Sequence, residues 1–355
     1  MQLAIPQPRA LRLSWKMSLL VGLLFLLLLV SLSIGALAIG PLDVLQLIGH
    51  RLGFVSEVDA TQALVLFNIR LPRLLLTVVV GAVLGLSGAS LQGIFRNPLV
   101  EPGTIGVSSG SALGVMLVIL LLGALFPSVE AALGRTWIMA LFAFLGGVLA
   151  TLATLQISRY QGRTQITYLI LAGVAITALA QAGIGLAIFY ADDNQLRTYT
   201  FWTLGDLSTG TWGKLSLLIP LAVVSGVGLL WLARPLNALA LGESEAYHSG
   251  VPVERVKLLV VFFSALAVGT SVAFVGIIGF VGLVVPHIVR MGFSSDHRVV
   301  LPASAIGGSI LLLLSDIFAR TVVAPAELPI GVVTAAIGTP FFIYLLISAK
   351  KKRLI

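Results

Sequence analysis

The chain has 355 residues, of which 58% are hydrophobic and 10% are charged, with a formal net charge of +8, a mean hydropathy of +1.07 and no cysteine. An ordinary soluble domain, with about 25% charged residues, is excluded by this composition, and so are disulfides, thiolate nucleophiles and cysteine-ligated metal sites. The basic residues stand in short gaps between apolar runs, which is typical of a membrane protein and not of a nucleic-acid-binding face.

Nine uncharged windows are long enough to cross a bilayer. They cover residues 17–42, 74–95, 102–129, 136–158, 164–191, 215–233, 258–289, 299–315 and 328–349. The first exceeds the apolar core of a signal peptide, so we expect it to be the first membrane helix. The window 258–289 would be about 48 Å long as one helix, against a hydrocarbon core of roughly 30 Å. Its middle is rich in glycine, threonine and serine, so we expect a full helix followed by a short one, and ten spans in total.

The distribution of lysine and arginine agrees with ten spans. With the amino terminus inside, ten spans place 15 of the 22 basic residues on the cytoplasmic side, whereas nine spans place only 10 there. The positive-inside rule therefore favours ten helices with both termini in the cytoplasm. The sequence predicts one all-α, polytopic membrane domain covering residues 1–355.

The chain has none of the motifs that would make it an ATPase, a zinc protease or a serine hydrolase of the G-x-S-x-G type. Almost every ionisable residue falls at a predicted helix end or in a loop. The nearest exception is Asp316, which we expect to form a local ion pair with Arg320 four residues later. Transport energy is then expected from a separate ATPase, while an ion-coupled secondary transporter and a structural or sensory membrane protein remain alternatives.

The loop at residues 234–252 has the pattern of two short helices joined by a bend. Gly242 and Gly250 can each close a helix, and Pro252 stops its continuation. Such a unit could push on a cytoplasmic partner, although a solvated connector would have a similar pattern.

Five runs, taken in order, resemble the permeases of the bacterial iron-siderophore, haem and cobalamin importers of the ATP-binding-cassette class. They are NIRLPR at 68–73, RNPLVEPG at 96–103, LALGE at 239–243, GFVGLVVPH at 279–287 and ELPIGVVT at 327–334. The resemblance covers nearly the whole chain and implies a ten-helix subunit of the bacterial inner membrane, surrounded by lipid. It also implies a homodimer that works with two cytoplasmic ATPase subunits and a periplasmic substrate-binding protein, without nucleic acid.

The same resemblance implies roles for individual residues. Those expected to dock the binding protein are Arg70, Arg73 and Arg320. Those expected to close the pathway on the cytoplasmic side are Asn97, Leu99, Ile166 and Thr167. Those expected to couple to the ATPase are Leu239, Leu241, Gly242, Glu243, Ala246 and Gly250. The loop departs from related loops at Ser249, where a larger apolar residue is usual. As alternatives, the first two arginines could be interfacial anchors, and Asn97-Pro98 could be only a helix-ending turn.

The substrate is indicated only by the segment 192–206, which resembles the outer turn after the fifth helix of haem permeases. Haem is therefore the favoured cargo, with ferric siderophores and cobalamin as alternatives. Tyr199, Phe201 and Trp202 in this segment could equally form an interfacial aromatic belt. We expect no cofactor and no metal site, since the four histidines fall outside mid-membrane and a conducting pathway should bind its cargo weakly.

Overall fold

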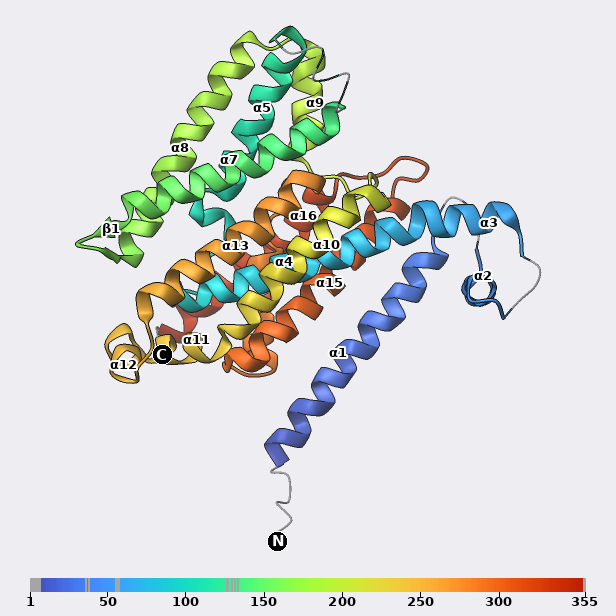
Figure 1. The fold of residues 1–355 in the computed structure, drawn as a ribbon. Helices are drawn as coiled ribbons and strands as arrows, with labels where there is room; N and C mark the ends of the chain where they lie inside the picture. Colours follow the sequence, from blue (N-terminus) through green and yellow to red (C-terminus); the bar gives the residue numbers. More distant parts are fainter. Residues whose placement is uncertain are drawn as a thin grey trace.

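The computed structural model describes residues 8–35, 37, 39–54, 58–125, 128, 130, 132 and 134–353, and it is almost entirely helical (Figure 1). The longer helices are α1 (Pro8–Ser33), α4 (Leu71–Phe95), α5 (Val107–Leu125), α7 (Arg135–Ile157), α8 (Ile166–Tyr190), α10 (Trp212–Trp231), α13 (Val253–Val275), α15 (His297–Thr321) and α16 (Ile330–Arg353). The shorter ones are α2 (Pro41–Arg51), α3 (Ala60–Val65), α9 (Asp193–Thr203), α11 (Ala233–Leu241), α12 (Glu243–His248) and α14 (Val281–Gly292), with a π-helical turn η1 (Leu66–Arg70) and a 3-10 turn η2 (Pro102–Ile105).

The helices have the lengths and composition of a polytopic membrane protein. Within the described residues, seven helical segments are long and apolar enough to cross a bilayer, and three shorter apolar helices lie at Val107–Leu121, Val281–Gly292 and Ile330–Tyr344. This confirms the membrane class of the fold. The count of ten crossings and the cytoplasmic location of both termini remain predictions.

The window 258–289 is divided as expected, because α13 ends at Val275 and α14 begins at Val281. The first window was predicted too long: α1 ends at Ser33, and a new helix, α2, begins at Pro41. The segment 192–206 is not only a turn, since most of it forms α9. Asp192 and Gln195 cap its first turn reciprocally, a signal that was visible in the sequence as D-x-x-Q.

A two-stranded hairpin is the one departure from an all-α fold among the described residues. It pairs β1 (Arg159–Tyr160) with antiparallel β2 (Arg163–Thr164) and leads into α8. Gln161 and Gly162 both have positive φ, which is the requirement of the tight turn that joins such strands.

Helix α4 lies at the centre of the bundle and is nearly all buried (Figure 1). It approaches α15 and α14 backbone to backbone through Gly81, Gly85 and Gly88. A Cβ added to Gly81 would lie 2.5 Å from the carbonyl oxygen of Gly308, and one added to Gly85 would overlap the carbonyl of Ser304. The close spacing of Gly81 and Gly85, typical of tightly packed membrane helices, is thus used for packing α4.

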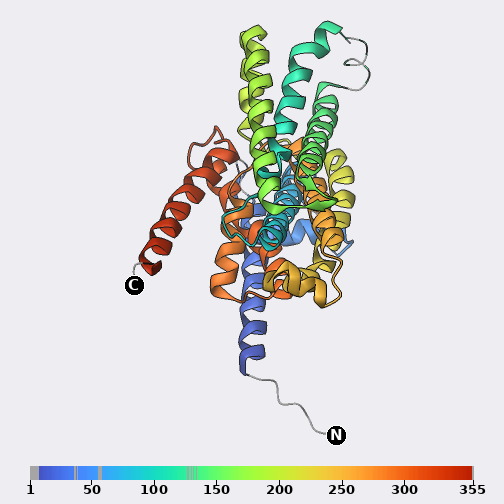
Figure 2. The same cartoon turned by 90° about the vertical axis from the view of Figure 1, so that its left-hand side faces the viewer.

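Helices α5, α7 and α8 extend beyond the rest of the bundle on one side, and α16 diverges from it at its carboxyl end (Figure 2). Helix α11 packs at the carboxyl end of α4, where Asn237 binds the start of α15 through Asp296 and His297. Lys16 of α1 donates a 2.5 Å hydrogen bond to the carbonyl of Gly292, so α1 begins on this same side of the molecule.

Candidate functional site

The arginines predicted to dock a binding protein gather where α4 begins and α15 ends. Arg73 donates to Asp316 at 2.8 and 3.0 Å and to Glu327 at 2.8 and 2.9 Å. Arg320 pairs with Asp316 at 3.1 Å, as the i, i+4 spacing predicted. Two guanidinium groups therefore share one carboxylate that is only 2% exposed.

Arg70 and Arg320 also hold the end of α1. Arg70 is 7% exposed and donates to the carbonyls of Leu32, Ser33 and Leu37. Arg320 donates to the carbonyl of Ile34 at 3.0 Å. Since the last carbonyls of a helix have no partner within it, these bonds explain why α1 can end in a partly buried place. The three arginines are brought together, but each already has internal acceptors, and their docking role remains a prediction.

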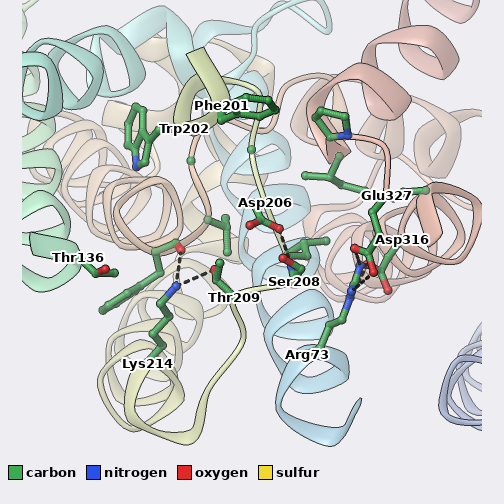
Figure 3. Close-up of a pocket in the computed structure, with 18 of the residues that line it drawn as sticks. Arg73, Thr136, Phe201, Trp202, Asp206, Ser208, Thr209, Lys214, Asp316 and Glu327 are labelled. Carbon is green, nitrogen blue, oxygen red and sulfur yellow. Dashed lines mark hydrogen bonds and ion pairs between the residues drawn. The ribbon is translucent and has the colours of Figure 1, made fainter. Parts of the chain in front are cut away.

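A cavity of about 430 Å³ lies beside this cluster, between α9, α10 and the ends of α13 and α15 (Figure 3). Lys214 and Thr209 lie on one side of it, Arg73 with Asp316 and Glu327 on the other, and Phe201 and Trp202 above. The volume falls in the range of small-molecule pockets, and its walls combine aromatic rings with charged groups.

Lys214 is the buried cation of this cavity. Its ammonium group donates to the hydroxyl of Thr209 at 2.7 Å and to the carbonyl of Phe274 at 3.5 Å. It is 7% exposed, and no salt bridge joins it to any carboxylate in the described parts of the chain. The sequence does not indicate this burial, because Lys214 directly precedes the apolar window 215–233, a position from which a lysine side chain ordinarily extends to water.

The aromatic residues of α9 do not form one lipid-facing belt. Tyr199 and Trp202 pack against two clusters, one formed by α5, α7 and α13 and the other by α5 and α8, and burial raises the pKa of Tyr199. Phe201 is 56% exposed. Two of the three rings therefore pack inside this end of the bundle.

The predicted gate residues lie in two segments at the other end of α4. Arg96 closes α4 in the left-handed conformation, and the side chain of Asn97 then accepts a 3.0 Å hydrogen bond from the amide of Leu99. The helix-ending turn weighed for Asn97-Pro98 is thus present. Leu99 and Thr167 are exposed in the single chain, while Ile166, the first residue of α8, packs on the core. The element η2, which follows the first segment, contacts α8 at Gly173, about two turns after the second segment.

The predicted coupling loop forms the two short helices expected, α11 and α12. Gly242 separates them with φ of 135°, and Gly250 follows α12 with φ of 80°. Leu239 and Ala246 are buried and anchor the pair on the bundle, whereas Leu241 is 78% exposed. The predicted set therefore divides into residues that hold the helices and residues that a partner could touch.

Glu243, at the start of α12, forms a 2.7 Å ion pair with Lys257 of α13. Lys257 is only 2% exposed. The sequence does not indicate this burial either, since Lys257 directly precedes the apolar window 258–289. Among the described residues, no group of three or more histidine, aspartate or glutamate side chains has the arrangement of a metal site.

Known proteins are similar in sequence to this chain over most of its length. The chain matches the FecCD transport family over residues 23–348. It is 42% identical to the hemin transport system permease protein HmuU of Yersinia pestis, over 94% of this chain and 97% of that protein. It is 41% identical to the vitamin B12 import system permease protein BtuC of Salmonella typhi, over 82% and 86% respectively.

A solved structure has the same fold. It is described as an inward-facing conformation of a metal-chelate type ABC transporter, and it matches with a TM-score of 0.79 and 35% identity, over 94% of this chain and 99% of that one. The family match, the identities and the shared fold lead to one conclusion: this chain belongs to the FecCD transport family and is an inner-membrane permease subunit of an ABC importer.

Proposed function

We propose that the chain carries haem across the inner membrane as a homodimer, with two ATPase subunits in the cytoplasm and a binding protein that delivers the cargo from the periplasm. The observation that supports haem is the 42% identity to a hemin permease over nearly the full length of both proteins. The likeness of the segment 192–206 to haem permeases supports the same cargo.

The walls of the bundle suit such a cargo. Haem is a flat, largely apolar macrocycle with two carboxylates, and it can slide along apolar and small side chains without its iron being ligated. The four histidines of the chain are not grouped into a ligand set in the described residues. Lys214 and the arginine cluster instead put positive charge at the outer end, where a carboxylate would arrive.

The outer arginines would dock acidic side chains of the binding protein, because opposite charges steer association. The structure changes how this is best tested. Arg70 is buried among carbonyls, so a glutamate there would disturb the fold as well as the dock. Glu327, which is 40% exposed and paired with Arg73, is the better position to mutate. Glu327→Gln should tighten binding of an acidic partner, and Glu327→Lys should tighten it further; weaker binding in both variants would contradict the docking assignment.

Cobalamin is the second candidate, because the vitamin B12 permease is 41% identical to this chain. The two cargoes can be separated in proteoliposomes that contain the permease, its ATPase and one loaded binding protein. Haem should enter only with ATP and with its own binding protein, whereas cobalamin presented by a cobalamin-binding protein should not enter. ATP-dependent uptake of cobalamin or of a ferric siderophore, with no uptake of haem under matched conditions, would refute haem and leave the family assignment intact.

A further inference from the structure

Lys257 stands at the meeting point of three elements on the side of the coupling helices. Its ammonium group donates to Glu243 of α12 at 2.7 Å, to the carbonyl of Thr164 in β2 at 2.8 Å and to Glu254 of α13 at 3.3 Å. The carboxylate of Glu254 in turn accepts a 2.7 Å hydrogen bond from the amide of Thr164. All three donors of the lysine are therefore used, and Thr164 is held through both its amide and its carbonyl.

The two arms of this lysine reach elements with different predicted roles. Glu243 is the first residue of α12, in the loop predicted to receive the ATPase. Thr164 lies two residues before Ile166, where α8 and the predicted gate begin. In the described parts of the chain, no other hydrogen bond or ion pair joins residues 159–165 to α11 or α12. Lys257 is thus the direct polar link between the coupling helix α12 and the strand β2 that leads into α8.

We propose that Lys257 is the positioning residue that transmits movement of the coupling helices to the cytoplasmic gate, by tying Glu243 to the backbone of Thr164. The inference rests on the gate and coupling roles of the proposed function, and it adds the connection between them. A buried ammonium loses much of its solvation, so moving one of its acceptors away costs free energy unless the other bonded groups follow. When the ATPase displaces Glu243, the ammonium group of Lys257 is pulled with it, and Lys257 in turn pulls Thr164 of β2, the strand that leads into α8.

The geometry also explains why a lysine serves here. Its flexible stem can follow a moving carboxylate while its three donors remain engaged, whereas the planar, forked donor set of arginine is fixed in direction. Glu254 lies 3.3 Å from the ammonium group and binds the amide of Thr164, so Lys257 and the strand are held together on the side of the link away from Glu243.

The test uses the full complex with its ATPase and binding protein. The chain has no cysteine, so Thr167→Cys supplies a single thiol in the permease at the predicted gate. In a complex whose other subunits are cysteine-free, the rate of maleimide modification is measured with and without ATP, together with cargo transported per ATP hydrolysed. The variants are Lys257→Met, Glu243→Ala, Lys257→Arg and, as a matched control, Arg255→Met, which alters an exposed residue on the same helix.

We expect Lys257→Met to remain assembled with the ATPase while the rate ratio falls toward one and transport per ATP falls by about tenfold, a factor equivalent to about 1.4 kcal/mol. Glu243→Ala should behave similarly, Lys257→Arg should recover part of the response, and Arg255→Met should match the parent. An unchanged ratio and unchanged transport in Lys257→Met overturn the proposal. If that variant fails to assemble, an unchanged ratio in Glu243→Ala overturns it, because this milder change cuts the same link. If the parent shows ATP-driven transport but ATP does not change the rate of maleimide modification at position 167, the gate assignment is wrong, and the proposed link is refuted as well.

Discussion

Asp316 offers the sharpest prediction about what holds together the end of the bundle where α4 begins and α15 ends. Asp316→Asn keeps the shape of the side chain and one acceptor oxygen but removes the charge that Arg73 and Arg320 share. Their side chains are 11% and 9% exposed, and that of Asp316 is 2% exposed, so water cannot replace the lost carboxylate. Breaking a buried ion pair by removing one partner costs about 3–5 kcal/mol. Because Arg73 keeps Glu327, we expect the lower end, about 3 kcal/mol.

The matched control is Glu327→Gln, which removes the other carboxylate bound by Arg73. The side chain of Glu327 is 40% exposed, so solvent screens the pair and its loss should cost less than about 1 kcal/mol. Unfolding can be followed in mixed micelles by titration with a denaturing detergent, using the fluorescence of the five tryptophans. Equal losses in the two variants, or a larger loss in Glu327→Gln, would refute the argument from burial.

Three further predictions concern packing, backbone strain and protonation. Gly85→Ala should destabilise the fold by about 1–3 kcal/mol because its Cβ meets the carbonyl of Ser304, whereas Gly185→Ala, with no atom within 4 Å, should be neutral or stabilising in the same titration. The added Cβ of Gly250→Ala meets no atom, but the alanine must hold a φ of 80°, which costs about 1 kcal/mol of backbone strain at the end of α12. Copurification with the ATPase should therefore fall. Gly292→Ala, whose Cβ also meets no atom and whose φ is not positive, should copurify normally. Burial raises the pKa of Glu101, so its favourable contribution is complete below its unfolded pKa of about 4.3 and is lost as pH rises through the raised value. Glu101→Gln should therefore flatten the dependence of the unfolding midpoint on pH above about 4.3, and an unaltered pH profile would contradict this.

The sequence allowed the membrane class, the division of the window 258–289 and the two coupling helices to be predicted, since each rests on local signals. Gly242 and Gly250 are examples, because both follow a helix and adopt the positive φ that glycine allows there at no steric cost. The predicted end of α1 was wrong because that end is fixed by residues far along the chain, Arg70 of η1 and Arg320 of α15. The burial of Lys214 and Lys257 could not be predicted for the same reason. Their partners lie in other helices and strands, and hydropathy along one segment does not identify them.

The arrangement of α4 has a mechanical consequence. Its 25 residues span about 37 Å without an internal proline, from the arginine cluster to the turn at Asn97. It meets α15 through the backbones of Gly81 and Gly85, and at its start Arg73 binds Asp316 of that helix. A push on the arginine cluster would then be carried along one straight helix, and the turn at Asn97 would receive it with no loop between to absorb the motion.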